Sequence, residues 1–157
     1  MFSHAVEGDL VMAGPDPERL AVLRSFREAN AILDRALTVA LDEEREMPLA
    51  WFEVLNALQA SGGKLRVLDL AERIVATPSS LSRQLTRMED DGFVRRDRGH
   101  ADDQRAVLIV LTREGRETWR RANTTYLRVV KRMFTGHLTE TDVANMHRVL
   151  SKLLENR

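Results

Sequence analysis

The sequence contains no cysteine. Disulfide bonds, thiolate metal sites and a thiol-based redox switch are therefore excluded, and any regulation must use other chemistry. The histidines, His4, His100, His137 and His147, include no closely spaced pair on one predicted helix face. We accordingly expect no metal site and no bound cofactor.

Long apolar runs are also missing, since no stretch approaches the roughly 18 apolar residues that span a membrane. The first fourteen residues hold Glu7 and Asp9 but no lysine or arginine, so the cationic start of a secretory signal is absent as well. With 43% hydrophobic and 31% charged residues, the 157-residue chain has the composition of an ordinary globular protein. We expect a single domain, or one module with helical extensions, in the cytoplasm.

The chain has no excess of either charge, because 24 lysines and arginines balance 24 aspartates and glutamates. A protein that binds nucleic acid is expected to show a basic surface. The charges are nevertheless segregated along the chain, with acids concentrated at Asp42, Glu43, Glu44 and Glu46 and seven basic residues between positions 113 and 132. A net charge of zero is therefore compatible with a local basic surface.

Both ends of the chain predict long helices. Residues 1–15 show no periodicity and are expected to form a flexible arm, after which Asp16-Pro17-Glu18 has the cap, first-turn proline and acid of a helix start. That helix should run to about residue 42 within a segment 16–47. Thr112 should cap another helix that ends near Gly136, and Thr139 with Asp142 forms a weak capping box for the last one.

The central segment, 48–112, alternates short helices and strands. Pro48 opens a helix that Ser61-Gly62-Gly63 ends, residues 64–66 suit a short strand, and residues 67–75 suit a short helix. Residues 93–98 and 106–111 are β-rich runs joined by the polar loop 99–105, which predicts a hairpin, or wing. The predicted fold class is mainly α with a small β-hairpin.

The helix predicted from about residue 77 to 91 has two contrasting faces. Thr77 can cap it and Pro78 can occupy its first turn, while Leu81, Leu85 and Met88 fall in one narrow sector. The opposite side holds hydroxyl groups and arginines, namely Ser79, Arg83, Thr86 and Arg87. Exposed arginines are usually only solvated, but small hydroxyl groups beside them leave such a face free to approach a DNA groove.

Three motifs occur in order around this helix. They are Leu70-Ala71-Glu72-Arg73, Gly92-Phe93-Val94-Arg95-Arg96, and Asp103-x-Arg105 followed after five residues by Leu111-Thr112. Together they make residues 48–112 closely resemble the MarR family of winged helix-turn-helix transcriptional regulators. The resemblance implies a homodimer in which the long helices of 16–47 and 113–157 interlock, while 48–112 forms the DNA-binding lobe.

The resemblance also implies roles for individual residues. The helix matching 77–91 enters the major groove, Arg105 reaches the minor groove, Asp103 holds Arg105 through a salt bridge, and Arg96 contacts the DNA backbone. The full set of expected DNA-binding residues is Thr77, Ser79, Ser80, Ser82, Arg83, Thr86, Arg87, Arg96, Asp103 and Arg105.

A small-molecule site is a further expectation. Relatives in the family often bind phenolic or other aromatic effectors near the junction of the dimer base and the reading lobe, and Trp51, Phe52, Trp119 and Tyr126 are the aromatic residues that would line such a site here. Packing is the plainer explanation, because aromatic residues at helical spacing usually belong to a core.

The expected function is therefore a dimeric, sequence-specific transcriptional repressor of a pseudo-palindromic operator, released from DNA by a small effector. The alternative is a winged-helix protein-interaction module that no longer binds DNA, which Glu89, Asp90 and Asp91 would favour. We do not expect an enzyme, because the chain lacks a nucleophile with an identifiable base and a glycine-rich phosphate loop. His100 and Asp102 lie at a predicted hairpin tip, which offers little of the shelter that catalysis needs.

Overall fold

The structure is a computed structural model that describes residues 14, 16–98 and 107–155. The chain divides into two units, residues 1–32 and residues 33–157, and the first helix, α1 (Pro17–Glu43), begins in the first unit and continues into the second. In the described part of the chain, no helix combines the length and the apolar content that crossing a bilayer needs.

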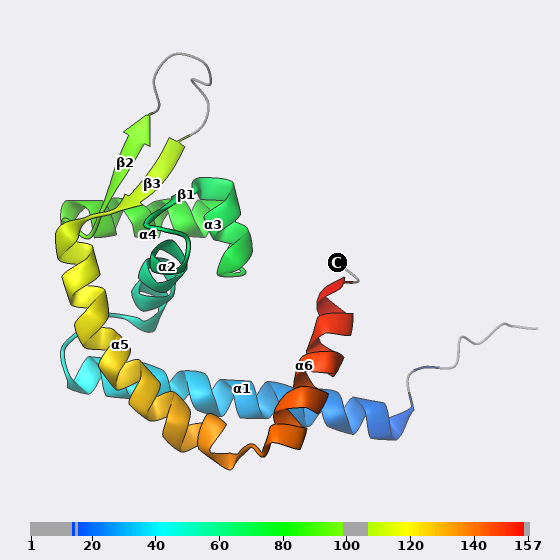
Figure 1. The fold of residues 1–157 in the computed structure, drawn as a ribbon. Coiled ribbons are helices and arrows are strands. Elements are labelled where there is room, and N and C mark those ends of the chain that lie inside the picture. Colours follow the sequence, from blue (N-terminus) through cyan, green and yellow to red (C-terminus); the bar gives the residue numbers. More distant parts are fainter. Residues whose placement is uncertain (1–13, 15, 99–106, 156–157) are drawn as a thin grey trace, which may run out of the picture. The chain divides into compact units, whose positions relative to one another are not determined.

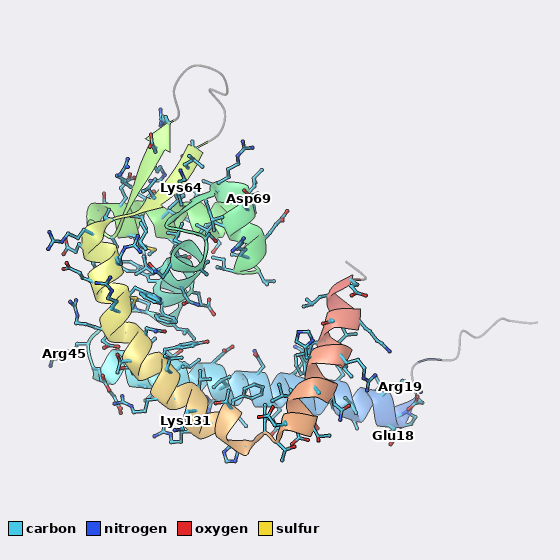
Figure 2. All side chains as sticks on the ribbon, in the orientation of Figure 1. Glu18, Arg19, Arg45, Lys64, Asp69 and Lys131 are labelled. Atoms are coloured by element: carbon cyan, nitrogen blue, oxygen red, sulfur yellow. The ribbon has the colours of Figure 1, made fainter. Side chains whose placement is uncertain are left out.

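The first unit contains the beginning of α1, which is capped as the sequence predicts. The backbone N–H of Arg19 donates to the Asp16 carboxylate over 3.0 Å, and this hydrogen bond, followed by that of the Arg19 side chain, lowers the pKa of Asp16. Figure 2 shows Arg19 next to Glu18 at the start of this helix. The apolar side chains of Leu20, Leu23 and Phe26 are exposed in the single chain, by 37%, 52% and 50%. Within the first unit itself, nothing described covers this stripe.

The second unit continues with the predicted alternation of helices and strands (Figure 1). The order is α2 (Leu49–Ala60), β1 (Lys64–Arg66), α3 (Val67–Arg73), α4 (Pro78–Asp90), β2 (Val94–Arg98), β3 (Val107–Leu111), α5 (Arg113–Met133), a 3-10 turn (Thr135–His137) and α6 (Glu140–Glu155). The strands form an antiparallel sheet in the order β1-β3-β2, in which Ile109 of β3 pairs with Leu65 on one side and Arg96 on the other. The family resemblance implied this winged architecture, and the structure has it.

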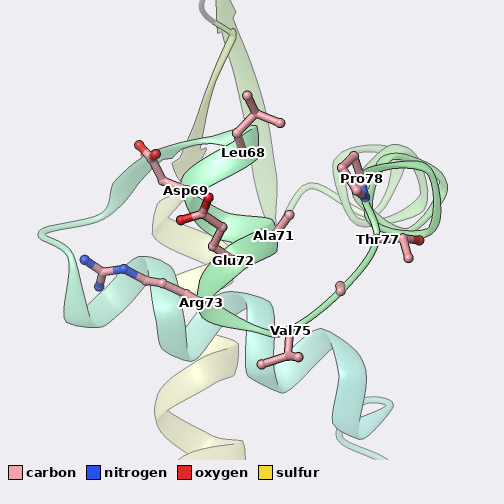
Figure 3. A pocket seen from close by; sticks show the side chains of 9 residues that line it. Leu68, Asp69, Ala71, Glu72, Arg73, Val75, Thr77 and Pro78 are labelled. Carbon is pink, nitrogen blue, oxygen red and sulfur yellow. The ribbon is translucent and has the colours of Figure 1, made fainter. Parts of the chain in front are cut away.

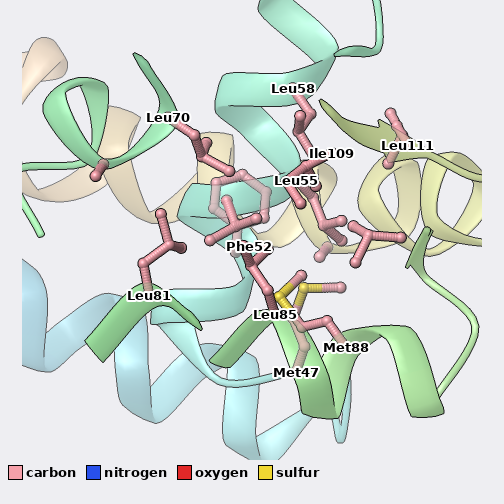
Figure 4. Packing of buried hydrophobic residues seen from close by; sticks show 14 of the residues in the cluster. Met47, Phe52, Leu55, Leu58, Leu70, Leu81, Leu85, Met88, Ile109 and Leu111 are labelled. Carbon is pink, nitrogen blue, oxygen red and sulfur yellow. The ribbon is translucent and has the colours of Figure 1, made fainter. Parts of the chain in front are cut away.

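The core of this unit lies between the helices and the sheet (Figure 4). Phe52, Leu55 and Leu58 of α2 are at most 1% exposed, and Ile109 of β3 is fully buried. The helix α4 contributes three side chains with at most 1% exposure, those of Leu81, Leu85 and Met88. One face of α4 is therefore fixed in the core, which leaves its opposite face to solvent.

The start of α5 is held against the base of the wing. The Thr112 hydroxyl shares its one hydrogen between the carbonyl oxygens of Gly92 and Phe93, at 2.6 Å and 3.0 Å, and accepts the backbone N–H of Gly115 over 3.0 Å. Thr112 is thus the predicted N-cap and also ties α5 to the segment before β2. At the start of α6, Thr139 and Asp142 exchange hydrogen bonds in both directions, as predicted for a capping box.

Two boundaries differ from the sequence-based expectation. The helix expected to reach residue 75 ends at Arg73, because Val75 adopts a positive φ of 54° that a right-handed helix cannot accommodate. The helix expected to end near Gly136 ends at Met133, and a 3-10 turn follows it. The chain there passes so close to the Lys131 carbonyl oxygen that a Cβ on Gly136 would lie only 2.5 Å from it.

Candidate nucleic-acid interface

The exposed face of α4 carries the residues predicted to meet DNA. Thr77 caps the helix by accepting the backbone N–H of Ser80 over 3.3 Å, and its hydroxyl lies 3.4 Å from that of Ser79. Ser82, Arg83, Thr86 and Arg87 are also exposed. In the part of the chain that the structure describes, no acidic group lies within ion-pair distance of Arg83 or Arg87. Both guanidinium groups are therefore available to an external acceptor.

Arg96 is placed differently from the other arginines. This residue of β2 has a side chain only 24% exposed, and its guanidinium forms an ion pair with Glu89 of α4. Its backbone N–H donates to the same carboxylate over 2.8 Å, and this hydrogen bond is the largest cause of the lowered pKa of Glu89. The second terminal nitrogen of Arg96 donates to the Ser82 carbonyl oxygen at 3.2 Å and to the Thr86 hydroxyl at 3.1 Å.

These contacts, which we call the Arg96 clasp, join β2 to two turns of α4 through Ser82, Thr86 and Glu89. The sequence did not reveal the clasp, because the seven-residue separation of Glu89 and Arg96 spans a helix end and a turn rather than one periodic element. Contact between Arg96 and the DNA backbone stays a prediction. The clasp shows in addition that Arg96 fixes the wing strand relative to the helix.

The basic segment of α5 is partly neutralised within the chain. Arg113 pairs with Glu117 at 3.0 Å, and Arg128 pairs with Glu44, which follows the end of α1. The buried Thr125 hydroxyl also donates to Glu44 over 2.6 Å, and this hydrogen bond, followed by that of Arg128, lowers the pKa of Glu44. The basic residues of α5 therefore give a weaker positive surface than their number in the sequence suggests.

The four aromatic residues expected around an effector have packing partners. Phe52 stacks on Tyr126 with ring centroids 4.5 Å apart, and Trp51 meets Phe93 edge to face at 5.9 Å. Trp119 donates its ring N–H to the Asn56 side chain over 3.2 Å. Burial raises the pKa of Tyr126, as expected for a phenol packed against a core. A role in effector binding stays a prediction for all four.

Open cavities occur at other places in the second unit. A cavity of about 1040 Å³ lies at the turn between α3 and α4 (Figure 3), and its lining includes Leu68, Asp69, Glu72 and Val75. Another of about 700 Å³ is lined by residues of α2 and α3 and by Leu154, and one of about 390 Å³ lies where α1 leads into α2. None of these three cavities includes the four predicted aromatic residues in its lining.

Asp103 and Arg105, together with His100 and Asp102, fall between residues 99 and 106 and lie outside the described residues. Their predicted roles at the wing stay predictions. The strands on either side, β2 and β3, do pair in register from Val94 opposite Leu111 to Arg98 opposite Val107. The base of the predicted wing is therefore present.

Comparison with known proteins agrees with this geometry. A model of the MarR family matches residues 46–106. The homoprotocatechuate degradative operon repressor of Escherichia coli is 35% identical over 102 residues, which cover 57% of this chain and 68% of the repressor. The chain belongs to the MarR family.

Solved structures of MarR family regulators share the fold over most of this chain. AbsC from Streptomyces coelicolor has a TM-score of 0.83 and 29% identity, with 92% of this chain and 97% of AbsC covered. Sco3205, a MarR family transcriptional regulator from the same organism, was solved in complex with DNA and has a TM-score of 0.83 and 28% identity, with coverage of 92% and 90%.

Proposed function

We propose that this MarR family protein is a sequence-specific, DNA-binding transcriptional regulator that acts as a homodimeric repressor in the cytoplasm. The observation that carries the proposal is the division of α4 into two faces. Leu81, Leu85 and Met88 fix one face in the core, whereas Arg83 and Arg87 are exposed on the other. The structure of Sco3205, a similar protein in complex with DNA, supports DNA binding.

Repression is proposed from the likeness of this chain to a repressor. The Escherichia coli protein is a repressor of an operon for homoprotocatechuate degradation, and the matched segment covers 68% of it. A dimeric regulator bound across a pseudo-palindromic operator would repress by occupying the DNA. We propose residues 48–112 as the DNA-binding lobe, with residues 16–47 and 113–157 as the dimerising segments and 1–15 as an arm.

Dimer formation is supported by apolar surface that the described part of a single copy leaves uncovered. In α6 no residue is buried, and Val143, Val149 and Leu153 are exposed by 49%, 47% and 64%. The first unit leaves its own apolar stripe, which includes Phe26, exposed in the same way. Such surface is characteristic of an interface. Twofold pairing would place two copies of α4 in successive major grooves when they lie about 34 to 36 Å apart.

Release by a small aromatic or phenolic effector completes the proposed function. An effector could bind better to dimers in which the spacing of the two α4 helices does not fit successive major grooves. Such an effector would shift the population away from DNA, since a ligand moves an equilibrium only through its differential affinity. Trp51, Phe52, Trp119 and Tyr126 remain our proposed effector residues, although three of these rings have ring contacts and Trp119 donates a hydrogen bond to Asn56. Movement of these rings would be needed to admit a ligand.

The protein-interaction alternative loses part of its support in the structure. It relied on an acidic end of α4, but Glu89 is paired with Arg96 and contributes to the wing rather than to a free acidic surface. Asp90 and Asp91 remain exposed. These two acids lie on the same helix as Arg83 and Arg87, which have no acidic partner among the described residues, and this balance favours DNA over an exclusively protein partner.

Fluorescence anisotropy with the DNA upstream of the protein's own gene tests the proposal. We expect sequence-preferring binding whose logarithm of affinity falls linearly with the logarithm of salt concentration, with a slope of about −0.9 for each phosphate neutralised. Unrelated duplex of equal length is the control. Binding that is absent there and at every selected site, or that does not respond to salt, would favour the protein-interaction alternative.

A further inference from the structure

Thr86 has an unusual position on the exposed face of α4, because its hydroxyl group is already used within the protein. That hydroxyl donates to the Ser82 carbonyl oxygen over 3.1 Å and accepts from Arg96 over 3.1 Å. A threonine hydroxyl has one hydrogen and two lone pairs. Its hydrogen and one lone pair are therefore committed before any ligand arrives.

The Arg96 clasp makes this commitment rigid. Arg96 is held on β2 by the strand ladder opposite Ile109 and is paired with Glu89 through both its backbone N–H and its guanidinium. The nitrogen that reaches Thr86 thus comes from a fixed group rather than a mobile surface arginine. Rotation of the Thr86 side chain would break two hydrogen bonds at once.

The side chain is exposed even though its oxygen is occupied. The hydroxyl oxygen retains one lone pair, while the apolar Cγ2 methyl is the part of the side chain that takes no part in these hydrogen bonds. At about 100° per residue, Thr86 lies within about 60° of Arg83 and about 20° of Ser79 around the helix axis. The methyl therefore belongs to the same surface as the groups that we propose to read DNA.

We propose that Thr86 is a specificity-determining residue that recognises the C5 methyl group of a pyrimidine in the major groove, which in unmodified DNA is a thymine. A threonine methyl in contact with the thymine methyl is a favourable apolar pair, and only thymine among the four unmodified bases displays a methyl group there. The inference rests on the proposed DNA-binding function and adds a base identity to it.

Replacement of single thymines by deoxyuridine tests the inference, because it removes only the methyl group from the duplex. On a preferred duplex found by selection, the equivalent thymine in each of the two half-sites is replaced together. We expect wild-type binding to weaken by about fourfold for each removed thymine methyl that Thr86 touches. Thr86→Ser keeps the hydroxyl and removes the methyl, so thymine and deoxyuridine duplexes should bind it equally at that position. Thr86→Val keeps a methyl and removes the hydroxyl, so the difference should persist.

The outcomes separate this inference from the proposed function. If the wild type shows no sequence preference for any duplex, both are wrong. If it does bind selectively but every deoxyuridine duplex binds as tightly as its thymine counterpart, only the reading by Thr86 is overturned. That reading is also overturned if Thr86→Ser retains the full difference between thymine and deoxyuridine.

Discussion

Replacing Arg83 with alanine should weaken binding to the preferred duplex by between about 5-fold and 150-fold and should also relax its sequence preference. A bidentate contact from an arginine to guanine contributes roughly 1 to 3 kcal/mol of discrimination, and every 1.4 kcal/mol is a factor of ten. The exposed side chain of Arg83, with no acidic partner in the described part of the chain, is free to make such a contact. Anisotropy against the preferred duplex and its single-base variants measures both effects.

Lys131→Ala is the matched control for Arg83→Ala, since it also removes one exposed positive charge but lies near the far end of α5. It should change affinity only slightly and leave the base preference intact. Arg105→Ala offers a further contrast with Arg83→Ala. It should weaken affinity through the wing, because Arg105 is expected to reach the minor groove. If Arg83→Ala binds like the wild type and still discriminates among bases, the assignment of α4 as the reading helix is wrong.

Replacing Gly115 with alanine should lower the free energy of unfolding by about 3 kcal/mol or more. A Cβ at this buried position in the first turn of α5 would lie 2.0 Å from the Phe93 carbonyl oxygen and 3.0 Å from Leu111. Backbone cannot move aside as a flexible side chain would, so α5 must shift away from the base of the wing. That shift would also strain the hydrogen bonds of Thr112 to Gly92 and Phe93.

Urea unfolding followed by circular dichroism measures this change, with Arg120→Ala as the control at an exposed position of the same helix. A surface substitution of that kind should stay within about 0.5 kcal/mol of the wild type. A Gly115→Ala protein as stable as the control would show that α5 does not pack against Phe93 as described.

The sequence predicted the elements of this fold where the signal is local. The caps at Asp16, Thr77, Thr112 and Thr139 each join a side chain to a backbone N–H three residues away, and the core face of α4 follows from helical spacing. Such interactions can be found without tertiary structure because both partners lie within one turn.

Features that depend on two separate elements were not predictable in the same way. The Arg96 clasp requires knowledge of how β2 lies against α4, and before the structure Glu89 counted as an acid favouring a protein partner. The end of α5 at Met133 and the 3-10 turn after it, where Gly136 comes close to the Lys131 carbonyl, are not recorded by any periodicity. The wing residues Asp103 and Arg105 were identified by family resemblance, and their roles stay predictions.

Selection of bound DNA from a random duplex pool is the most direct test of the central claim that two copies of α4 read B-form DNA together. We predict an enriched pseudo-palindrome whose half-site centres lie about 10 to 10.5 base pairs apart, in line with one helical turn. Repeated selection that enriches no sequence, performed with protein shown to be folded and dimeric, would contradict the account.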